Sequence, residues 1–140
     1  MVVVDIEDTL LQIARDYQQW GVAFVGVSAN DADAYPADGF DRMAARTREK
    51  QYPFPYLYDA SQEVAKAYGA MCTPDFFVYD RDRRLAYRGR MDETRPGTGK
   101  AHGGDLRRAL DELLAKGSVT GEQFPSIGCN IKWKPGNQPA

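Results

Sequence analysis

Histidine and cysteine are scarce in this sequence, whose 140 residues include one histidine and two cysteines. The histidine, His102, lies in a glycine-rich loop with no carboxylate or thiol motif beside it. We therefore expect a solvated residue, and we largely exclude Cys-His or Ser-His hydrolysis and histidine-rich metal sites. Two cysteines, Cys72 and Cys129, cannot form a disulfide scaffold or a four-ligand zinc site on their own. A reducing, cytoplasmic location is the simplest expectation, and thiols there are more often catalytic or inert than structural.

Long apolar runs and a strong net charge are also missing. No apolar run approaches the roughly 18 residues that a membrane span requires. The net charge of −2 gives no basic field, so we expect neither a membrane nor a nucleic acid as a partner. With 43% hydrophobic and 27% charged residues, the composition is that of an ordinary globular protein. At this length we expect one domain over residues 1–117, followed by an extended tail over residues 118–140 that packs on it.

Periodicity and turn residues predict an alternation of helices and strands. Apolar residues at helical spacing predict a first helix that ends at Gly21 and a last helix that ends at Gly117. The apolar residues of the first helix are Ile6, Leu10, Ile13, Ala14, Tyr17 and Trp20, and those of the last are Leu106, Ala109, Leu110, Leu113 and Leu114. Between them we expect a strand at Val22–Ser28, a helix at Phe40–Lys50, extended chain at Tyr52–Asp59, a short helix from an N-cap at Ser61 to Tyr68, and a hairpin of strands Asp75–Asp80 and Leu85–Met91.

The resulting order, α-β-α-α-β-β-α, is that of an α/β sandwich. A leading helix followed by a buried strand needs an earlier parallel strand to complete a right-handed βαβ unit. Met1–Val4 is β-prone but too short to supply that strand. The sequence therefore predicts an α/β sandwich without its usual first strand, as if the chain began inside the fold.

Several stretches carry a resemblance to a known family. "YGAMCTPDFFVYDRDRRLAYRGRM" is similar to the second half of a thioredoxin fold, with a Thr-Pro bond that is cis in that family. Together with "GVAFVGVSANDADAYP", "FPYLYD" and "PSIGCNIKWKPGN", it resembles the peroxiredoxin-like branch of the alkyl hydroperoxide reductase and thiol-specific antioxidant (AhpC/TSA) group. The likeness covers nearly the whole chain. It implies a thioredoxin-like fold, in which a central mixed β-sheet is flanked by helices.

The resemblance implies thiol redox chemistry without a metal or organic cofactor. Members of the branch carry an Asn-x-Cys-Pro segment at the start of the first helix, where the helix dipole lowers the pKa of the nucleophilic cysteine. Here Met1 falls about where the residues after Cys-Pro would lie. We therefore expect weak or no peroxidase turnover from this chain. Its substrate would be a peroxide or disulfide, and an external thiol reductant would supply the electrons.

Each candidate site residue also has a structural interpretation. Cys72 is a candidate resolving thiol, which could form a disulfide with an oxidised nucleophile, or it is a small buried apolar residue. Cys129 is the weaker candidate, and it could pair with Cys72, pair with a second chain, or stay free. Thr73 and Pro74 would shape the substrate groove, or they form a rigid turn into the next strand. Trp133 is expected to anchor the tail.

A different class of function is a non-catalytic binding or assembly module. A sheet that lacks one strand exposes backbone hydrogen-bonding groups, which another chain could cover by strand addition or swapping. We therefore also expect self-association into a homo-oligomer. A Cys72→Ser variant separates the two hypotheses, because it should impair redox function and leave assembly intact.

Overall fold

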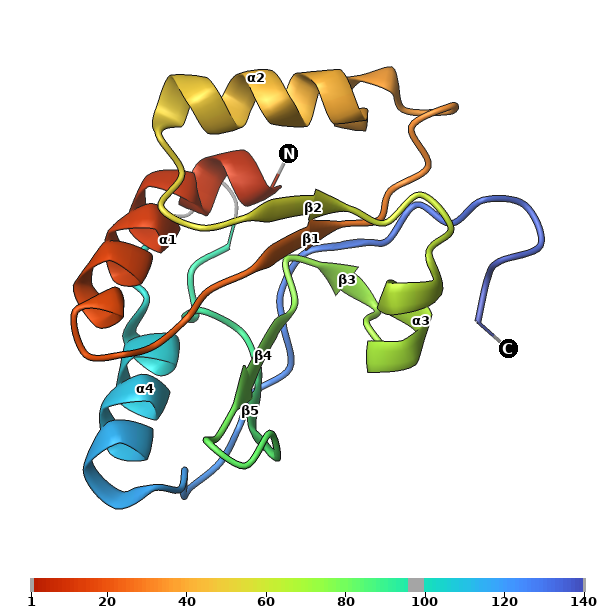
Figure 1. The fold of residues 1–140 in the computed structure, drawn as a ribbon. Coiled ribbons are helices and arrows are strands. Elements are labelled where there is room, and N and C mark those ends of the chain that lie inside the picture. The colour runs from red at the N-terminus through yellow and green to blue at the C-terminus, as the bar shows by residue number, and fades with distance from the viewer. Residues whose placement is uncertain (1, 96–99, 140) are drawn as a thin grey trace. The chain divides into compact units, whose positions relative to one another are not determined.

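Helices and short strands alternate along the chain in the computed structural model, which describes residues 2–95 and 100–139. Met1, on which the prediction about the start of the chain rests, lies outside the described residues. The chain divides into two units, drawn together in Figure 1. The first is made from Met1–Val22 and Cys72–Asn130, and the second from Ala23–Met71 and Ile131–Ala140. The C-terminal stretch is thus shared between them.

The first unit contains two helices and two antiparallel strand pairs. Its elements are α1 (Val2–Gln18), β3 (Cys72–Thr73), β4 (Phe76–Tyr79), β5 (Leu85–Gly89), α4 (Gly104–Lys116) and β6 (Cys129–Asn130). Strand β3 pairs with β6, and β4 pairs with β5. The β4–β5 pair is the hairpin predicted from the sequence. Its turn is closed by Asp80, whose side chain accepts hydrogen bonds from the backbone N–H groups of Asp82 and Arg84.

Helices α1 and α4 supply much of the first unit's core. Ile13 and Ala14 are fully buried on α1, and Leu106 and Leu110 are buried on α4. Polar bonds join the two helices, which lie side by side in Figure 1. Tyr17 Oη donates to Asp111 Oδ1 over 2.6 Å, and Arg107 Nη1 donates to Asp16 Oδ2 over 3.0 Å. Burial and the Asp111 carboxylate raise the pKa of Tyr17 to about 12, so its phenol stays protonated.

The second unit is built around a parallel strand pair. Its elements are β1 (Gly26–Ser28), the 3₁₀ turn η1 (Pro36–Asp38), α2 (Phe40–Lys50), β2 (Tyr56–Tyr58) and α3 (Glu63–Tyr68). The sequence predicts a strand over Val22–Ser28, but only its last three residues pair with β2. Gly26 donates to the carbonyl of Pro55. In a parallel ladder the preceding hydrogen bond would be donated by the backbone N–H of the residue just before β2. That residue is Pro55, which has no N–H, so the ladder does not extend further toward Val22.

Gln62 holds the C-terminal stretch of the second unit. Its side chain is fully buried and uses all four of its hydrogen-bonding positions. Nε2 donates to the carbonyls of Ala29 and Lys132, and Oε1 accepts from Lys134 N–H and Asn137 Nδ2. The predicted anchor, Trp133, is only half-buried. Gln62 is also the N-cap of α3, where the sequence predicts Ser61.

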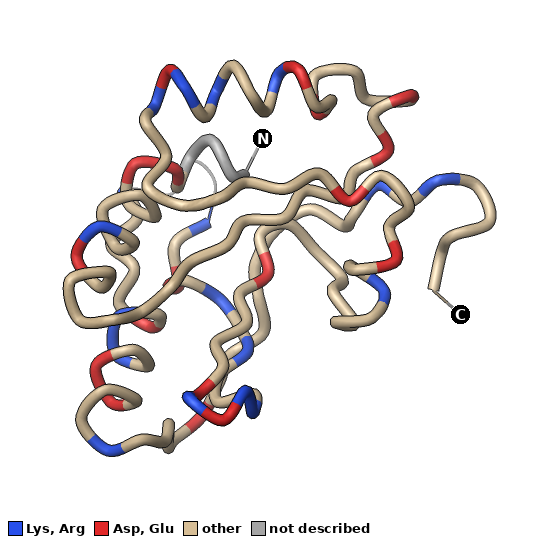
Figure 2. Tube along the Cα trace, viewed as in Figure 1, with Lys and Arg blue, Asp and Glu red and all other residues tan. Residues whose placement is uncertain are grey.

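The α/β class predicted from the sequence is confirmed. The strands form three separate pairs within the described part of the chain, rather than one continuous mixed sheet. Residues Val2–Val4, although β-prone, belong to α1, and no strand precedes that helix within residues 2–95. Figure 2 shows charges of both signs interspersed along α2, α4 and the hairpin turn. No helix among residues 2–95 and 100–139 is both long and apolar enough to cross a membrane.

Candidate redox site around Cys72

Cys72 opens the short strand β3, directly before the Thr73–Pro74 peptide bond, which is cis. Its thiol is half-buried, and Sγ lies 3.8 Å from the carbonyl oxygen of Pro74, to which it can donate. Three of the four predicted site residues, Cys72, Thr73 and Pro74, are consecutive in the sequence. Their backbone leads from β3 directly into β4.

Cys129, the fourth predicted site residue, pairs with Thr73 in the β3–β6 ladder, and Asn130 pairs with Cys72. Side chains of directly paired residues lie on the same face of a sheet, and those of successive residues lie on opposite faces. The side chains of Cys72 and Cys129 therefore belong to opposite faces of this strand pair. Both cysteines are free, and Cys129 is exposed. A Cys72–Cys129 disulfide, which the sequence leaves open, would require the pair to rearrange.

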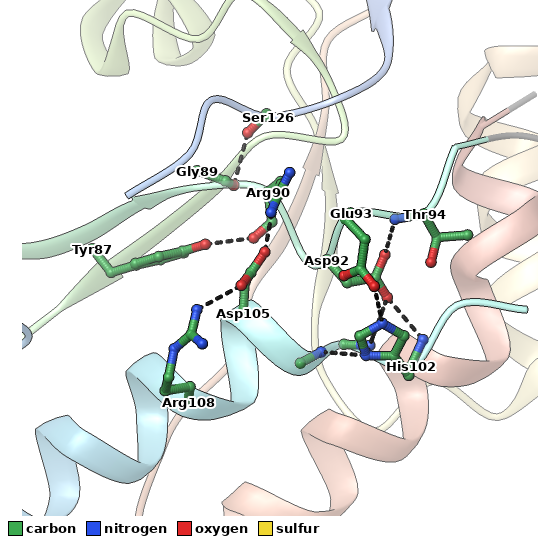
Figure 3. Close-up of polar contacts among 12 residues, drawn as sticks. Tyr87, Gly89, Arg90, Asp92, Glu93, Thr94, His102, Asp105, Arg108 and Ser126 are labelled. Atoms are coloured by element: carbon green, nitrogen blue, oxygen red, sulfur yellow. Dashed lines mark hydrogen bonds and ion pairs between the residues drawn. The ribbon is translucent and has the colours of Figure 1, made fainter. Parts of the chain in front are cut away.

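Three polar residues influence the Cys72 thiol and contact one another. Asp75 precedes β4, Arg88 lies on β5, and Ser126 comes from the chain ahead of β6. Ser126 Oγ lies 2.7 Å from Asp75 Oδ1 and 2.7 Å from the carbonyl oxygen of Gly89, the second contact being drawn in Figure 3. Arg88 Nη2 lies 3.3 Å from Asp75 Oδ2. Cys72, Asp75, Arg88 and Ser126 are called the Cys72 cluster below.

The electrostatics of the cluster favour the protonated thiol. Burial raises the pKa of Cys72, and the negative charge of Asp75 raises it further. The positive charge of Arg88 and a hydrogen bond from Ser126 act in the opposite direction but do not cancel these effects. Cys72 is therefore not an activated nucleophile at neutral pH, since the thiolate is the reactive form.

Gly128 brings the C-terminal chain against this site. A Cβ atom at position 128 would lie 2.1 Å from the carbonyl oxygen of Thr73 and 3.2 Å from the nitrogen of Pro74. Only glycine permits that approach, which explains why β6 can pair with β3.

A cavity of about 20 Å³ is lined by Pro74, Ile6 and Ile127, among other residues, and not by Cys72. It has room for about one water molecule.

A second polar cluster contains Asp92, Glu93 and His102 (Figure 3). Asp92 is buried and accepts backbone N–H bonds from Thr94, His102 and Gly103, which is the N-cap of α4. The ring of His102 is exposed, as expected, but it is not without polar partners. Its Nε2 lies 2.9 Å from Glu93 Oε1, which raises the pKa of His102.

The second cluster could supply metal ligands, because one ligand atom from each side chain lies within 4.8 Å of the others. Its hydrogen bonds favour another role. Gly104 N–H donates to His102 Nδ1 over 3.0 Å, so the neutral ring carries its hydrogen on Nε2. A metal bound to Nε2 would require the hydrogen to move to Nδ1. Nδ1 could then no longer accept the hydrogen bond from Gly104 N–H. The bonds to Asp92 and His102 instead fix the residues at the N-terminus of α4.

The sequence suggests Cys72, Thr73 and Pro74 as candidates but not the three polar residues of the Cys72 cluster. Asp75 lies three positions after Cys72 and could have been considered. Arg88 could have been found from the predicted hairpin, in which it pairs with Phe77. Ser126 had no signal, because the tail lacks any periodicity that would predict its position.

Comparisons with known proteins identify a family and two similar solved structures. The model of the AhpC/TSA family matches residues 7–88. A crystal structure of a hypothetical protein from Sinorhizobium meliloti is 53% identical, with a TM-score of 0.92 over 96% of this chain and 74% of that one. An uncharacterized conserved protein from Geobacillus kaustophilus is 50% identical, with a TM-score of 0.91 over 96% of this chain and 71% of that one. A search of curated proteins finds no match.

Proposed function

Because the chain belongs to the AhpC/TSA family of thioredoxin-like proteins, we propose that it serves as a thiol-dependent oxidoreductase of peroxiredoxin-like type, with Cys72 in the resolving role. The observation that carries this proposal is the setting of the thiol. The thiol is half-buried, it can donate to the carbonyl of Pro74, and the charges of the Asp75–Arg88 ion pair act on it in opposite directions. Titratable groups arranged in this way are typical of functional sites, although structural ion pairs share the feature.

The raised pKa of Cys72 argues against a first attack on peroxide, which requires a thiolate, and leaves the resolving role as the proposed one. In the proposed step, the Cys72 sulfur attacks the sulfenic-acid sulfur of an oxidised nucleophilic cysteine. A disulfide forms, and the leaving hydroxide takes up the thiol proton as water. An external thiol then reduces the disulfide. The step uses no metal or organic cofactor, and a reducing cytoplasmic location belongs to the same proposal.

Thr73 and Pro74 would border the approach to the thiol. The Cys129–Asn130 strand already pairs with β3, so an extended substrate could pair with Thr73 only after β6 has left. Cys129, on the opposite face of the pair, is the weaker redox candidate. Peroxide turnover by this chain alone should be weak, and rapid thiol-dependent peroxide consumption would contradict the proposal.

The direct test is thiol–disulfide exchange at Cys72. A Cys129→Ser variant, which retains Cys72 as its only cysteine, is incubated with glutathione disulfide and its intact mass is recorded without reductant. The proposal predicts the gain of one glutathionyl group, located by peptide mapping at Cys72 and removed by a thiol reductant. A variant that also carries Cys72→Ser is the matched control. An unmodified Cys129→Ser protein would contradict the redox role.

A second candidate function, a self-associating binding module, is favoured by exposed apolar side chains on the parallel strand pair. Val27 is 42% exposed and its register partner Leu57 is 53% exposed. Parallel strands are normally covered on both faces. Light scattering should then show concentration-dependent association that Val27→Lys abolishes, while Val64→Lys, at a comparably exposed valine on α3, leaves it unchanged. A monomer at all concentrations would contradict this function.

A further inference from the structure

We propose that His102 is a pH-sensitive switch at the start of α4, in which one ring nitrogen exchanges its partner. In the neutral ring, Nδ1 accepts the backbone N–H of Gly104. In the protonated ring, Nδ1 carries a hydrogen, releases Gly104 and turns toward the carboxylate of Asp92. The switch is a conformational device, and it does not depend on the redox role proposed for Cys72.

The neutral ring of His102 is held by a bond at each nitrogen. Gly104 N–H donates to Nδ1 over 3.0 Å, and Nε2 lies 2.9 Å from Glu93 Oε1 (Figure 3). Since Nδ1 accepts, the hydrogen of the neutral ring is on Nε2 and points to Glu93. Gly104 is the first residue of α4, so its N–H has no partner within the helix. The neutral ring therefore caps this helix.

Protonation of His102 is incompatible with that cap, because both ring nitrogens then become donors. The hydrogens of Nδ1 and of Gly104 N–H would face each other between nitrogens that are 3.0 Å apart. An acceptor for the new donor is close, since Asp92 Oδ2 lies 4.0 Å from Nδ1. A small rotation of the exposed ring brings Nδ1–H toward that carboxylate. The contact between Nε2 and Glu93 becomes an ion pair.

The charged groups that act on the ring are all negative. They are Glu93 and Asp92, which follow β5, and Asp105 in the first turn of α4. The bond to Glu93 is the main cause of the raised pKa of His102, and slight burial opposes it. The bond to His102 lowers the pKa of Glu93, and three backbone N–H groups lower that of Asp92 despite its burial. Both carboxylates therefore stay charged while the ring titrates.

The two states have opposite pH dependence. The pKa of His102 is higher in the folded chain than its ordinary value of about 6.5. Its ion pairs thus stabilise the fold fully below that value, and this contribution disappears as the pH rises through the folded pKa. The bond from Gly104 follows the reverse course, since it forms above the folded pKa and is lost below it.

The test is nuclear magnetic resonance of the ¹⁵N-labelled protein between pH 8 and pH 5. A scalar coupling between the Gly104 amide nitrogen and His102 Nδ1 exists only across a hydrogen bond. It should be present at pH 8 and absent at pH 5, while the ring nitrogen shifts show Nδ1 gaining its hydrogen. A coupling that is absent at pH 8, or that persists at pH 5, would overturn the switch.

Two variants test the parts of the switch separately. In His102→Asn the side-chain oxygen can still accept Gly104 N–H, as in an Asx turn, but it cannot titrate. The Gly104 amide resonance, which should move upfield in the wild type as the pH falls, should then stay in place. A resonance that still moves with the wild-type midpoint would contradict the proposal.

Glu93→Gln removes the charge that mainly favours the protonated ring, so the titration midpoint of His102 should shift to lower pH. Glu122→Gln, at an exposed glutamate in the C-terminal stretch, is the matched control and should leave the midpoint unchanged. Circular dichroism establishes that each variant is folded. An unchanged midpoint in Glu93→Gln would overturn the role of Glu93 in the switch.

Discussion

At the scale of single residues, Cys72 lies under the influence of two opposite charges. Asp75 raises the pKa of the thiol and Arg88 lowers it. The two residues are ion-paired with each other, so a change in either one alters the influence of both. Besides burial, the reactivity of the thiol therefore depends on one residue close to the cysteine in the sequence, Asp75, and on one from strand β5, Arg88. Arg88 in particular supplies the basic group that the sequence near Cys72 lacks.

Arg88→Gln should make Cys72 less reactive. Removing the guanidinium leaves Asp75 uncompensated, which raises the pKa of the thiol further and lowers the thiolate fraction at neutral pH. Alkylation by iodoacetamide at pH 7.5, in the Cys129→Ser background, should be slower by about threefold, a modest effect because Arg88 is partly exposed. Arg84→Gln, in the exposed hairpin turn, should leave the rate unchanged. Faster alkylation of Arg88→Gln would contradict this view of the site.

At the scale of elements, buried polar side chains fix the ends and connections of the helices. Asp92 accepts three backbone N–H bonds ahead of α4. Burial alone would raise its pKa, but these bonds outweigh burial and the pKa of Asp92 is lowered. A carboxylate with a lowered pKa stabilises the folded state above its unfolded pKa of about 3.9, and this contribution is lost as the pH falls through the folded value.

Asp92→Asn should lower the free energy of unfolding at pH 7 by about 2 kcal/mol, since the amide cannot replace all of these charge-assisted bonds. The difference from the wild type should shrink as the pH falls below about 4, where the wild-type carboxylate becomes protonated as well. Urea unfolding across this pH range measures both effects. Asp82→Asn, in the exposed turn, is the control. A difference that grows at acid pH would have the wrong sign.

Gln62 plays the corresponding role in the second unit. Gln62→Met keeps the length of the side chain but removes four hydrogen bonds, and it leaves the amide of Lys134 without its acceptor. Hydrogen exchange should show faster exchange of the Lys134 and Asn137 region, with a loss of about 1–3 kcal/mol in local stability. Gln19→Ala, at an exposed residue just after α1, should not change exchange there. Unaltered protection of the C-terminal stretch would show that other contacts hold it.

Local patterns in the sequence predicted those elements that depend on local physics. The bounds of α2, the hairpin of β4 and β5, and the buried leucines of α4 follow from periodicity and turn residues. Trp20, expected on the buried face of the first helix, lies beyond its end and is 70% exposed. The cluster around Cys72 and the role of Gln62 depend on contacts between residues more than thirty positions apart. No local pattern encodes such contacts.

At the scale of the whole molecule, the two cysteines differ in what they can reach. Cys129 is exposed, and Cys72 is half-buried on the other face of the β3–β6 pair. Their side chains cannot meet while that pair remains intact. A disulfide within one chain is therefore disfavoured, and Cys129 is free to meet a second copy of the chain.

Oxidation with diamide should therefore produce disulfide-linked dimers through Cys129. Non-reducing electrophoresis and intact mass should show the dimer in the wild type and in Cys72→Ser, and only monomer in Cys129→Ser. The prediction would be contradicted by a wild-type monomer that is lighter by two hydrogens and is lost in both single variants. Such a product would mean that the Cys72–Cys129 bridge forms within one chain.

The most direct test of the account remains the intact mass of the Cys129→Ser protein after incubation with glutathione disulfide, measured without reductant. The proposed redox role predicts one glutathionyl group at Cys72, which a thiol reductant releases and which is absent when Cys72→Ser is added. A protein of unchanged mass, still folded by circular dichroism, would contradict the account and identify Cys72 as a structural residue.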